Sequence, residues 1–248
     1  MIRVDKPSEG ERGERGRQGR GEELADSAKI ATLPMPYDVD TLSAACVETV
    51  KANKLEECYL RPLAFVGDGA MGLGARDNPT RVTIIAWKWG AYLGEDGLKR
   101  GIRAKVSSFS RAGVNALMAK GKVVGHYVNS ILAKREVLQN GYDEAIMLDP
   151  QGYVCEASGE NIFVVRNGVV STAPLGSSIL GGITRETTIR LMQDMGLEVR
   201  ERLIGRDELY LAAEVFMVGT AAQVTPARDA DDRTGGPGAR APPPATVH

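Results

Sequence analysis

The sequence predicts an α+β protein in which helices and strands alternate along one stretch of chain. Leu42, Cys46 and Val50 recur at helical spacing, whereas several other short runs are rich in β-branched and aromatic residues and end at glycine. Asn167-Gly168 lies between two apolar runs, which is the strongest short signal for a β-hairpin. The chain has 248 residues, enough for one large domain or two modest ones.

The individual elements follow from these patterns in chain order. Amphipathic spacing with polar starts and glycine ends predicts helices over 38–54, 129–141, 184–196 and 206–213. Asp40 is the expected N-cap of the first helix. For the third helix, an ordinary N-cap by Thr184 is the alternative to an anion-binding N-terminus. Apolar or alternating runs predict strands within 58–67, 81–90, 101–110, 143–157, 161–172, 197–204 and 214–226.

The two ends differ from the middle in composition. Residues 1–23 are rich in arginine, glutamate and glycine, and residues 227–248 contain few large apolar residues. Such segments bury too little apolar surface to offset their ordering entropy, so both are expected to be disordered tails. Between them we expect the remnant of a small N-terminal domain over 24–106, an interdomain connection over 107–118 and a large domain over 119–226.

Composition narrows the possible partners and the compartment. The formal net charge is −1, which gives no electrostatic reason to bind nucleic acid or an anionic membrane. There is neither an apolar run long enough to span a bilayer nor an apolar core of a secretory signal. The three cysteines are scattered, which is typical of reduced thiols in the cytoplasm rather than of disulfides or a zinc site.

Two lysines, Lys120 and Lys122, lie two residues apart in a small, apolar run just before a predicted helix. A lysine acts as a nucleophile only after losing its proton, which apolar surroundings favour. Taken alone, this run is more simply explained by two solvated loop lysines.

Three further features could carry chemistry. Glu156 ends a strand among small residues, and a carboxylate there could face a ring nitrogen or simply stabilise a turn. Gly181 and Gly182 precede a helix that starts near Thr184, as in anion-binding helix N-termini. Thr220 and Ala221 end a strand and could present a hydroxyl and N–H groups to a phosphate or a carboxylate. A lysine, an acid and two anion-binding backbone sites, here called anion cups, are together what an enzyme dependent on pyridoxal phosphate requires.

Long ordered motifs extend this interpretation. They read YLRPLAFVGDGAMGLG, WKWGAYLG, AKGKVVGHYVNSILAKRE, GYDEAIMLDPQGYVCEASGENIFVVRNGVV, GGITRETTIRL and DELYLAAEVFMVGTAAQVTP. Over residues 24–226 the sequence resembles branched-chain amino acid aminotransferases, class IV enzymes dependent on pyridoxal 5'-phosphate. The resemblance implies the D-amino-acid-aminotransferase-like fold of type IV, with two α/β domains of which the N-terminal one is incomplete. It also implies transamination of leucine, isoleucine or valine with 2-oxoglutarate by a cytoplasmic homodimer or hexamer.

The resemblance also assigns roles residue by residue. It makes Lys122 the Schiff-base lysine and Lys120 only its neighbour, while His126 receives no role. Other cofactor contacts that it implies are Tyr127 at the phenolic oxygen, Glu156 at the ring nitrogen, Leu180 against the ring, and Ile183, Thr184 and Thr220 at the phosphate. The substrate contacts that it implies are Tyr59 and Arg61, with the amides of Thr220 and Ala221 at the α-carboxylate.

The chain also departs from the family pattern. No YG…FEG.R motif is found near the N-terminus, and Glu23 stands where relatives carry an arginine that binds the phosphate. We therefore expect a reading frame truncated or shifted at both ends. The alternatives to a working branched-chain enzyme are an inactive remnant of it and a class IV relative, such as aminodeoxychorismate lyase or D-amino acid aminotransferase.

Overall fold

The computed structural model describes residues 11–56, 58–90 and 93–234. They form two compact units, the first ending at Trp89 but also including Gly121–Val123, and the second made of the remainder. The boundary thus falls earlier than the one expected at residue 106. The reason is that strand β3 (Ile102–Val106) pairs with strands β4 and β10 of the second unit.

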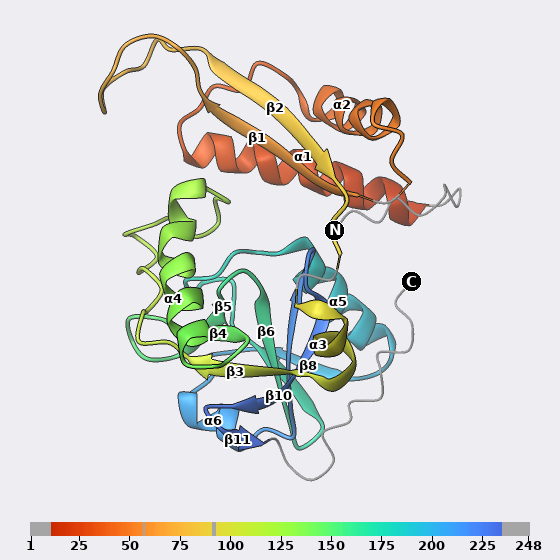
Figure 1. Cartoon of the computed structure of the whole chain (residues 1–248), viewed down its shortest axis with the longest axis vertical. Coiled ribbons are helices and arrows are strands. Elements are labelled where there is room, and N and C mark those ends of the chain that lie inside the picture. The colour runs from red at the N-terminus through yellow and green to blue at the C-terminus, as the bar shows by residue number, and fades with distance from the viewer. Residues whose placement is uncertain (1–10, 57, 91–92, 235–248) are drawn as a thin grey trace. The chain divides into compact units, whose positions relative to one another are not determined.

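The first unit combines two helices with a two-stranded antiparallel sheet (Figure 1). Its elements are α1 (Glu11–Ile30), α2 (Val39–Ala52), β1 (Tyr59–Val66) and β2 (Thr80–Trp87). Val50 of α2 and Leu60 of β1 belong to one small buried cluster. Helix α2 begins after Asp38, whose carboxylate accepts a hydrogen bond from Thr41 N at 2.8 Å. The N-cap is therefore Asp38 and not Asp40, because only Asp38 precedes the first helical residue.

Residues 11–23 belong to helix α1, where the sequence analysis expected part of a disordered tail. Arginine and glutamate are good helix formers, and a single well-packed turn can anchor a longer helix. The anchor lies near the C-terminal end of α1, where Ser27 and Ala28 are buried. Residues 1–10 of the expected tail lie outside the described residues.

Six strands of the second unit pair into a closed ring. They are β3, β4 (Glu144–Leu148), β5 (Val154–Ala157), β6 (Asn161–Arg166), β9 (Glu214–Gly219) and β10 (Gln223–Ala230). Each strand pairs with the next in the order β3-β4-β5-β6-β9-β10, and β10 pairs with β3 again. Strands β7 (Val169–Thr172) and β8 (Glu198–Glu201) extend the sheet from β6.

The interior of this ring is the main apolar core. Buried residues from all six strands form one cluster, which includes Ile102, Ile146, Val154, Ile162, Met217 and Ala230. Alternation along β4 sends Ala145 and Met147 to the outer face, where they meet Ala133 and Val137 of α4 (Tyr127–Gln139). Helix α5 (Ile183–Asp194) packs against another outer cluster, which contains Phe163 and Phe216. Figure 1 shows both helices outside the strands.

Most local predictions are confirmed in this unit. Asn167 and Gly168 adopt φ values of 51° and 77°, which suits a tight hairpin turn between β6 and β7. The predicted helices near 129, 184 and 206 are α4, α5 and the short α6 (Arg206–Tyr210). The N-cap of α5 is Gly182 rather than Thr184, since helical geometry already starts at Ile183. Two short helices, α3 (Gly94–Arg100) and the 3₁₀ turn η1 (Val124–His126), were not predicted.

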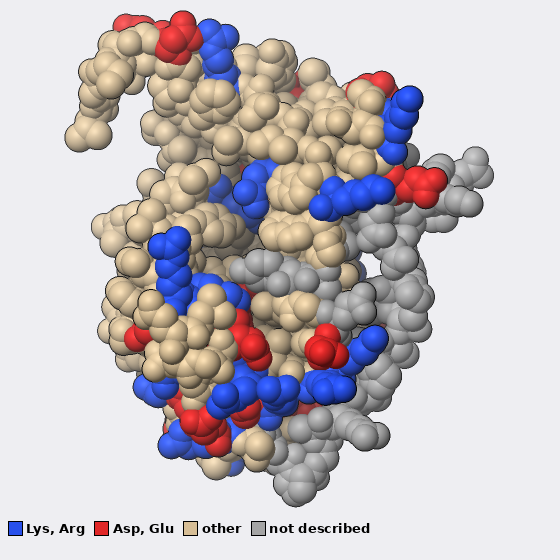
Figure 2. Space-filling model, in the orientation of Figure 1, with Lys and Arg blue, Asp and Glu red and all other residues tan. Residues whose placement is uncertain are grey.

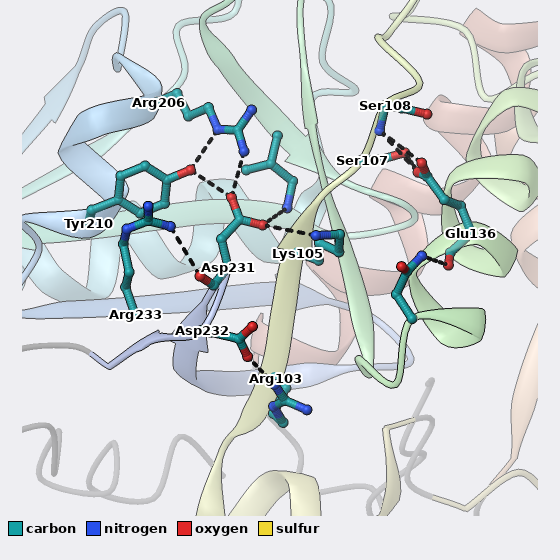
Figure 3. A network of polar contacts seen from close by, with 12 residues as sticks. Arg103, Lys105, Ser107, Ser108, Glu136, Arg206, Tyr210, Asp231, Asp232 and Arg233 are labelled. Carbon is teal, nitrogen blue, oxygen red and sulfur yellow. Dashed lines mark hydrogen bonds and ion pairs between the residues drawn. The ribbon is translucent and has the colours of Figure 1, made fainter.

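Residues 227–234 are folded, although the sequence analysis expected a disordered tail from 227 onwards. They complete β10 and form β11 (Arg233–Thr234). Strand pairing and the buried Ala230 hold part of this segment, and polar contacts add to them. The Asp231 carboxylate accepts hydrogen bonds from Arg206 at 2.7 Å, Tyr210 at 2.6 Å and Val106 N at 3.0 Å (Figure 3). Counting apolar residues could not reveal such an anchor. Residues 235–248 lie outside the described residues.

Acidic and basic side chains are interspersed around α6, β10 and β11 on the face drawn in Figure 2. This mixture agrees with the near-zero formal charge of the chain. None of the helices in the described part of the chain combines the length and apolar character that a membrane span requires.

Candidate active site

Glu156 is the buried carboxylate at the centre of the predicted site in the second unit. It lies on β5, opposite Met147 of β4, and is 5% exposed. Its Oε2 accepts hydrogen bonds from Leu180 N at 3.0 Å and from Asn161 Nδ2 at 3.3 Å. Its Oε1 lies 2.6 Å from a guanidinium nitrogen of Arg111. Because a buried carboxylate is costly unless it is paired, these contacts favour an ionised, fixed Glu156.

Arg111 is a site residue that the sequence analysis missed. It follows β3 in a segment without regular structure that was interpreted only as a connection. Its side chain is 11% exposed, and it also donates to Ser130 Oγ at 3.1 Å and to Ser178 O at 3.3 Å. The sequence indicated only that a buried Glu156 would require a cationic partner. It did not indicate which lysine or arginine would be that partner.

Asn161 joins the parts of this site. Its side-chain nitrogen donates to Leu180 O at 2.9 Å as well as to Glu156. Its backbone is in register with Glu156 on one side and with Val218 of β9 on the other. Asn161 was not among the site residues predicted from the sequence. It is the point where β5, β9 and the loop before α5 converge.

The N-terminus of α5 is suited to bind an anion. The first N–H groups of a helix have no acceptor within that helix, and Gly182 supplies no side-chain cap. A Cβ atom built on Gly182 would lie 2.4 Å from Asn161 Oδ1, so glycine permits this close approach. Ile183 and Thr184, predicted at a phosphate, are the first two residues of the helix.

Thr220 and Ala221 lie in the connection between β9 and β10. Gln223, with φ at 58°, pairs with Gly219 and closes this turn. Val218 of β9 pairs with Asn161, and the side chain of Asn161 donates to Leu180 O in the loop before α5. Thr220 comes only two residues after Val218. The two predicted anion cups therefore lie at the same end of the strands.

A second group of buried acids lies in the same unit. Glu144 on β4 is fully buried, and its carboxylate accepts hydrogen bonds from the amine of Lys134 and the hydroxyl of Ser158. Glu160, which is 5% exposed, accepts a hydrogen bond from Gly159 N at 3.1 Å. Burial, reinforced by the negative charge of Glu144, raises the pKa of Glu160 to about 8. These surroundings favour the neutral form of Glu160.

The two lysines have different surroundings. Lys120 Nζ donates to Ile179 O at 2.9 Å, and its pKa is lowered by burial, in part offset by the charge of Glu156. Lys122 belongs to the first unit, where its backbone N–H donates to Ser27 Oγ at 2.9 Å. Lys122 Nζ lies 3.5 Å from the carboxylate of Glu23. The acid at position 23 is thus an ion-pair partner of Lys122.

Tyr127 and His126 lie where η1 passes into α4. Tyr127 is the first residue of α4 and is half-buried. His126 lines a small pocket, together with Arg111, Leu117 and Asn129. The pocket adjoins Glu156 through Arg111, so this histidine lies beside the site even though no chemical role was predicted for it.

The residues predicted to contact the substrate, Tyr59 and Arg61, lie on the two-stranded sheet of the first unit. The guanidinium of Arg61 lies 5.5 Å from the ring centre of Tyr59 and 5.4 Å from that of Trp87. The ring of Trp89 packs edge-on to Tyr59 at 4.8 Å. Three aromatic rings and one cation thus form a surface that can accept an apolar side chain and a carboxylate.

Comparison with known proteins agrees with this arrangement. The amino-transferase class IV family matches residues 22–230, so the chain belongs to this family of enzymes. It is 47% identical over 221 residues to the branched-chain-amino-acid aminotransferase of Pseudomonas aeruginosa, covering 89% of this chain and 72% of that one. The resemblance and the type IV fold predicted from the sequence are confirmed.

Solved structures give the same result. The crystal structure of the Escherichia coli branched-chain amino acid aminotransferase superposes with a TM-score of 0.88 at 45% identity, covering 90% of this chain and 73% of that one. The branched-chain amino acid aminotransferase from Thermobaculum terrenum, in its PLP-bound holo-form, gives a TM-score of 0.81 at 36% identity, covering 88% of this chain and 71% of that one. Class IV aminotransferases act on small molecules and use pyridoxal 5'-phosphate as their cofactor.

Proposed function

We propose that this chain transfers the amino group of leucine, isoleucine or valine to 2-oxoglutarate with pyridoxal 5'-phosphate as cofactor. The observation that carries the proposal is the buried Glu156, paired with Arg111 beside the glycine-led N-terminus of α5, within a chain that belongs to the class IV family. The relatives named above are branched-chain enzymes, which supports this substrate class.

The residues of the second unit fit the cofactor. Glu156 has the charge needed to accept a hydrogen bond from a protonated ring nitrogen, and Leu180 lies next to it in the loop that donates to its carboxylate. The amides of Ile183 and Thr184, with the hydroxyls of Thr184 and Thr220, would hold the phosphate. Tyr127 would donate to the phenolic oxygen. The bound cofactor supplies a ring that withdraws electrons from the substrate α-carbon.

Lys122 is the amine proposed to bond the cofactor and then to carry the proton at the substrate α-carbon. Both tasks need an uncharged amine. The carboxylate of Glu23 at 3.5 Å favours the charged form, so this ion pair has to open before Lys122 can react. Once the pair has opened and the amine has lost its proton to solvent, Lys122 would be able to take the proton from the substrate α-carbon.

Two groups are proposed to position the substrate. The amides of Thr220 and Ala221 bind its α-carboxylate, which orients the α-carbon toward the proton carrier. Tyr59 and Arg61 receive the side chain, and the guanidinium of Arg61 pairs with the second carboxylate when the substrate is glutamate. The aromatic rings around Arg61 provide apolar contact for a branched side chain instead.

The test compares wild type with Lys122→Ala and the matched control Lys120→Ala. Each protein is titrated with pyridoxal phosphate, and the visible absorbance of the lysine-bound cofactor is followed. We expect the band in wild type and Lys120→Ala but not in Lys122→Ala, together with 2-oxoisocaproate formed from leucine and 2-oxoglutarate. A band without this product would reject branched-chain substrates, and assays for pyruvate release and for D-amino acids would then identify another class IV reaction. No band in wild type would reject the proposed function.

A homodimer or hexamer and a cytoplasmic location remain predictions. Sedimentation of the purified protein decides the first, and fractionation of the source cells decides the second.

A further inference from the structure

We propose that Arg111 is a positioning residue, which keeps Glu156 ionised and correctly turned so that the proton stays on the ring nitrogen of the bound cofactor. The proposal rests on the proposed function, since it concerns the cofactor that this function needs. The structure supports it with a buried ion pair of 2.6 Å between the Arg111 guanidinium and Glu156 Oε1.

The guanidinium of Arg111 is held by its surroundings and not only by Glu156. One nitrogen donates to Ser130 Oγ at 3.1 Å on α4, and another donates to Ser178 O at 3.3 Å in the loop before α5. The backbone N–H of Arg111 donates to Leu148 O at 2.8 Å, at the end of β4. A planar group fixed on several sides presents its charge to one oxygen in one direction.

The partners of Glu156 divide between its two oxygens. Oε1 meets the cation, whereas Oε2 accepts from the neutral groups Leu180 N and Asn161 Nδ2. Because these contacts engage both oxygens, they prevent the carboxylate from rotating and fix its orientation.

Arg111 acts on the ring nitrogen through its charge, which lowers the basicity of Glu156. A positive charge beside a carboxylate makes the carboxylate a weaker base. A proton shared between Glu156 and a pyridine nitrogen is then retained by the nitrogen. Without Arg111, Glu156 would lose its ion pair at 2.6 Å and keep the neutral donors Leu180 N and Asn161 Nδ2, with Lys120 acting on it only as a nearby charge. The carboxylate would then be a stronger base and would take the proton itself. The ring would then be neutral and a poorer electron acceptor.

The variants are Arg111→Met, which removes the charge, and Arg111→Lys, which keeps it. Lysine cannot reproduce the planar set of contacts, so we expect it to restore only part of the function. Arg202→Met is the matched control, since Arg202 forms a 2.6 Å ion pair with Glu208 elsewhere in the same unit.

The main readout is the ¹⁵N NMR signal of bound pyridoxal phosphate labelled at the ring nitrogen. We expect a protonated nitrogen in wild type and Arg202→Met, a neutral one in Arg111→Met, and mostly protonated nitrogen in Arg111→Lys. With leucine as substrate, kcat of Arg111→Met should fall roughly 10- to 100-fold, the size of one lost charge-assisted hydrogen bond, while KM changes little.

A second readout needs no cofactor. Urea unfolding of the cofactor-free variants Arg111→Met, Glu156→Gln and the double variant should show strong coupling between the two positions. If the nitrogen stays protonated in Arg111→Met, the positioning role is overturned even when the coupling is present. If wild type binds no cofactor at all, the proposed function fails and this proposal fails with it.

Discussion

Replacing Glu160 with glutamine should stabilise the cofactor-free chain, and the gain should depend on pH in a defined way. The pKa of Glu160 rises from the ordinary 4.5 to about 8, because burial and Glu144 disfavour its charged form. Between these values the folded state keeps a proton that the unfolded state has lost, so stability falls as pH rises. Each pH unit above the unfolded pKa of 4.5 lowers the free energy of unfolding by about 1.4 kcal/mol. The loss relative to low pH is therefore roughly 3 kcal/mol at pH 7 and roughly 4 kcal/mol at pH 8.

Glutamine is neutral at every pH, so Glu160→Gln removes this cost while it keeps an oxygen to accept from Gly159 N. Urea unfolding at pH 5, 6, 7 and 8 measures the difference between variant and wild type. The difference should be small at pH 5 and should grow steadily up to pH 8. Glu186→Gln is the control, since Glu186 is exposed on α5 and its side chain meets only Arg190 at 3.2 Å among the described contacts. A difference that does not change with pH would refute the reasoning.

Three further changes have defined outcomes. Gly182→Ala should lower the free energy of unfolding by about 1–3 kcal/mol, because the added Cβ displaces the Asn161 side chain from its partners; urea unfolding measures this. Asp231→Ala should cost about 2–3 kcal/mol in the same assay, because it removes charge-assisted hydrogen bonds that hold residues 227–234. Burial raises the pKa of Cys155 to about 12, so thiol reagents at pH 8 should label the half-buried Cys46 first, and mass spectrometry of the native protein identifies the labelled residue.

Much of the second unit could be predicted because its signals are local. The hairpin at Asn167-Gly168 needs only a turn in which both residues accept positive φ. The strand and helix patterns between 129 and 226 depend on apolar spacing, which the sequence displays directly. Closure of six strands into a ring could not be predicted, since it depends on β10 returning to β3 from far along the chain.

Two of the errors share one physical cause. The segment around Asp231 was expected to be disordered because it lacks apolar residues, yet its carboxylate is held by hydrogen bonds and its side chain is only 7% exposed. Burial alone would raise the pKa of Asp231, but donation from Tyr210 and Arg206 outweighs burial and lowers it. Arg111 was missed for the same reason, since its role depends on Glu156, an acid far along the chain. Polar contacts between distant residues leave no periodic pattern in a sequence.

The two lysines show where local physics and family membership diverge. Burial lowers the pKa of Lys120, which by itself would favour it as the nucleophile, whereas Lys122 forms an ion pair with Glu23 at 3.5 Å. A lowered pKa is nevertheless only one requirement, because a nucleophile also needs a free path to its target. The amine of Lys120 is committed to the carbonyl of Ile179, a buried residue whose oxygen would lose this donor if Lys120 left. The ion-pair partner of Lys122 is Glu23, a partly exposed carboxylate that water can solvate once the pair opens. This difference supports the proposed choice of Lys122, for which the aldehyde of the cofactor would have to compete with Glu23.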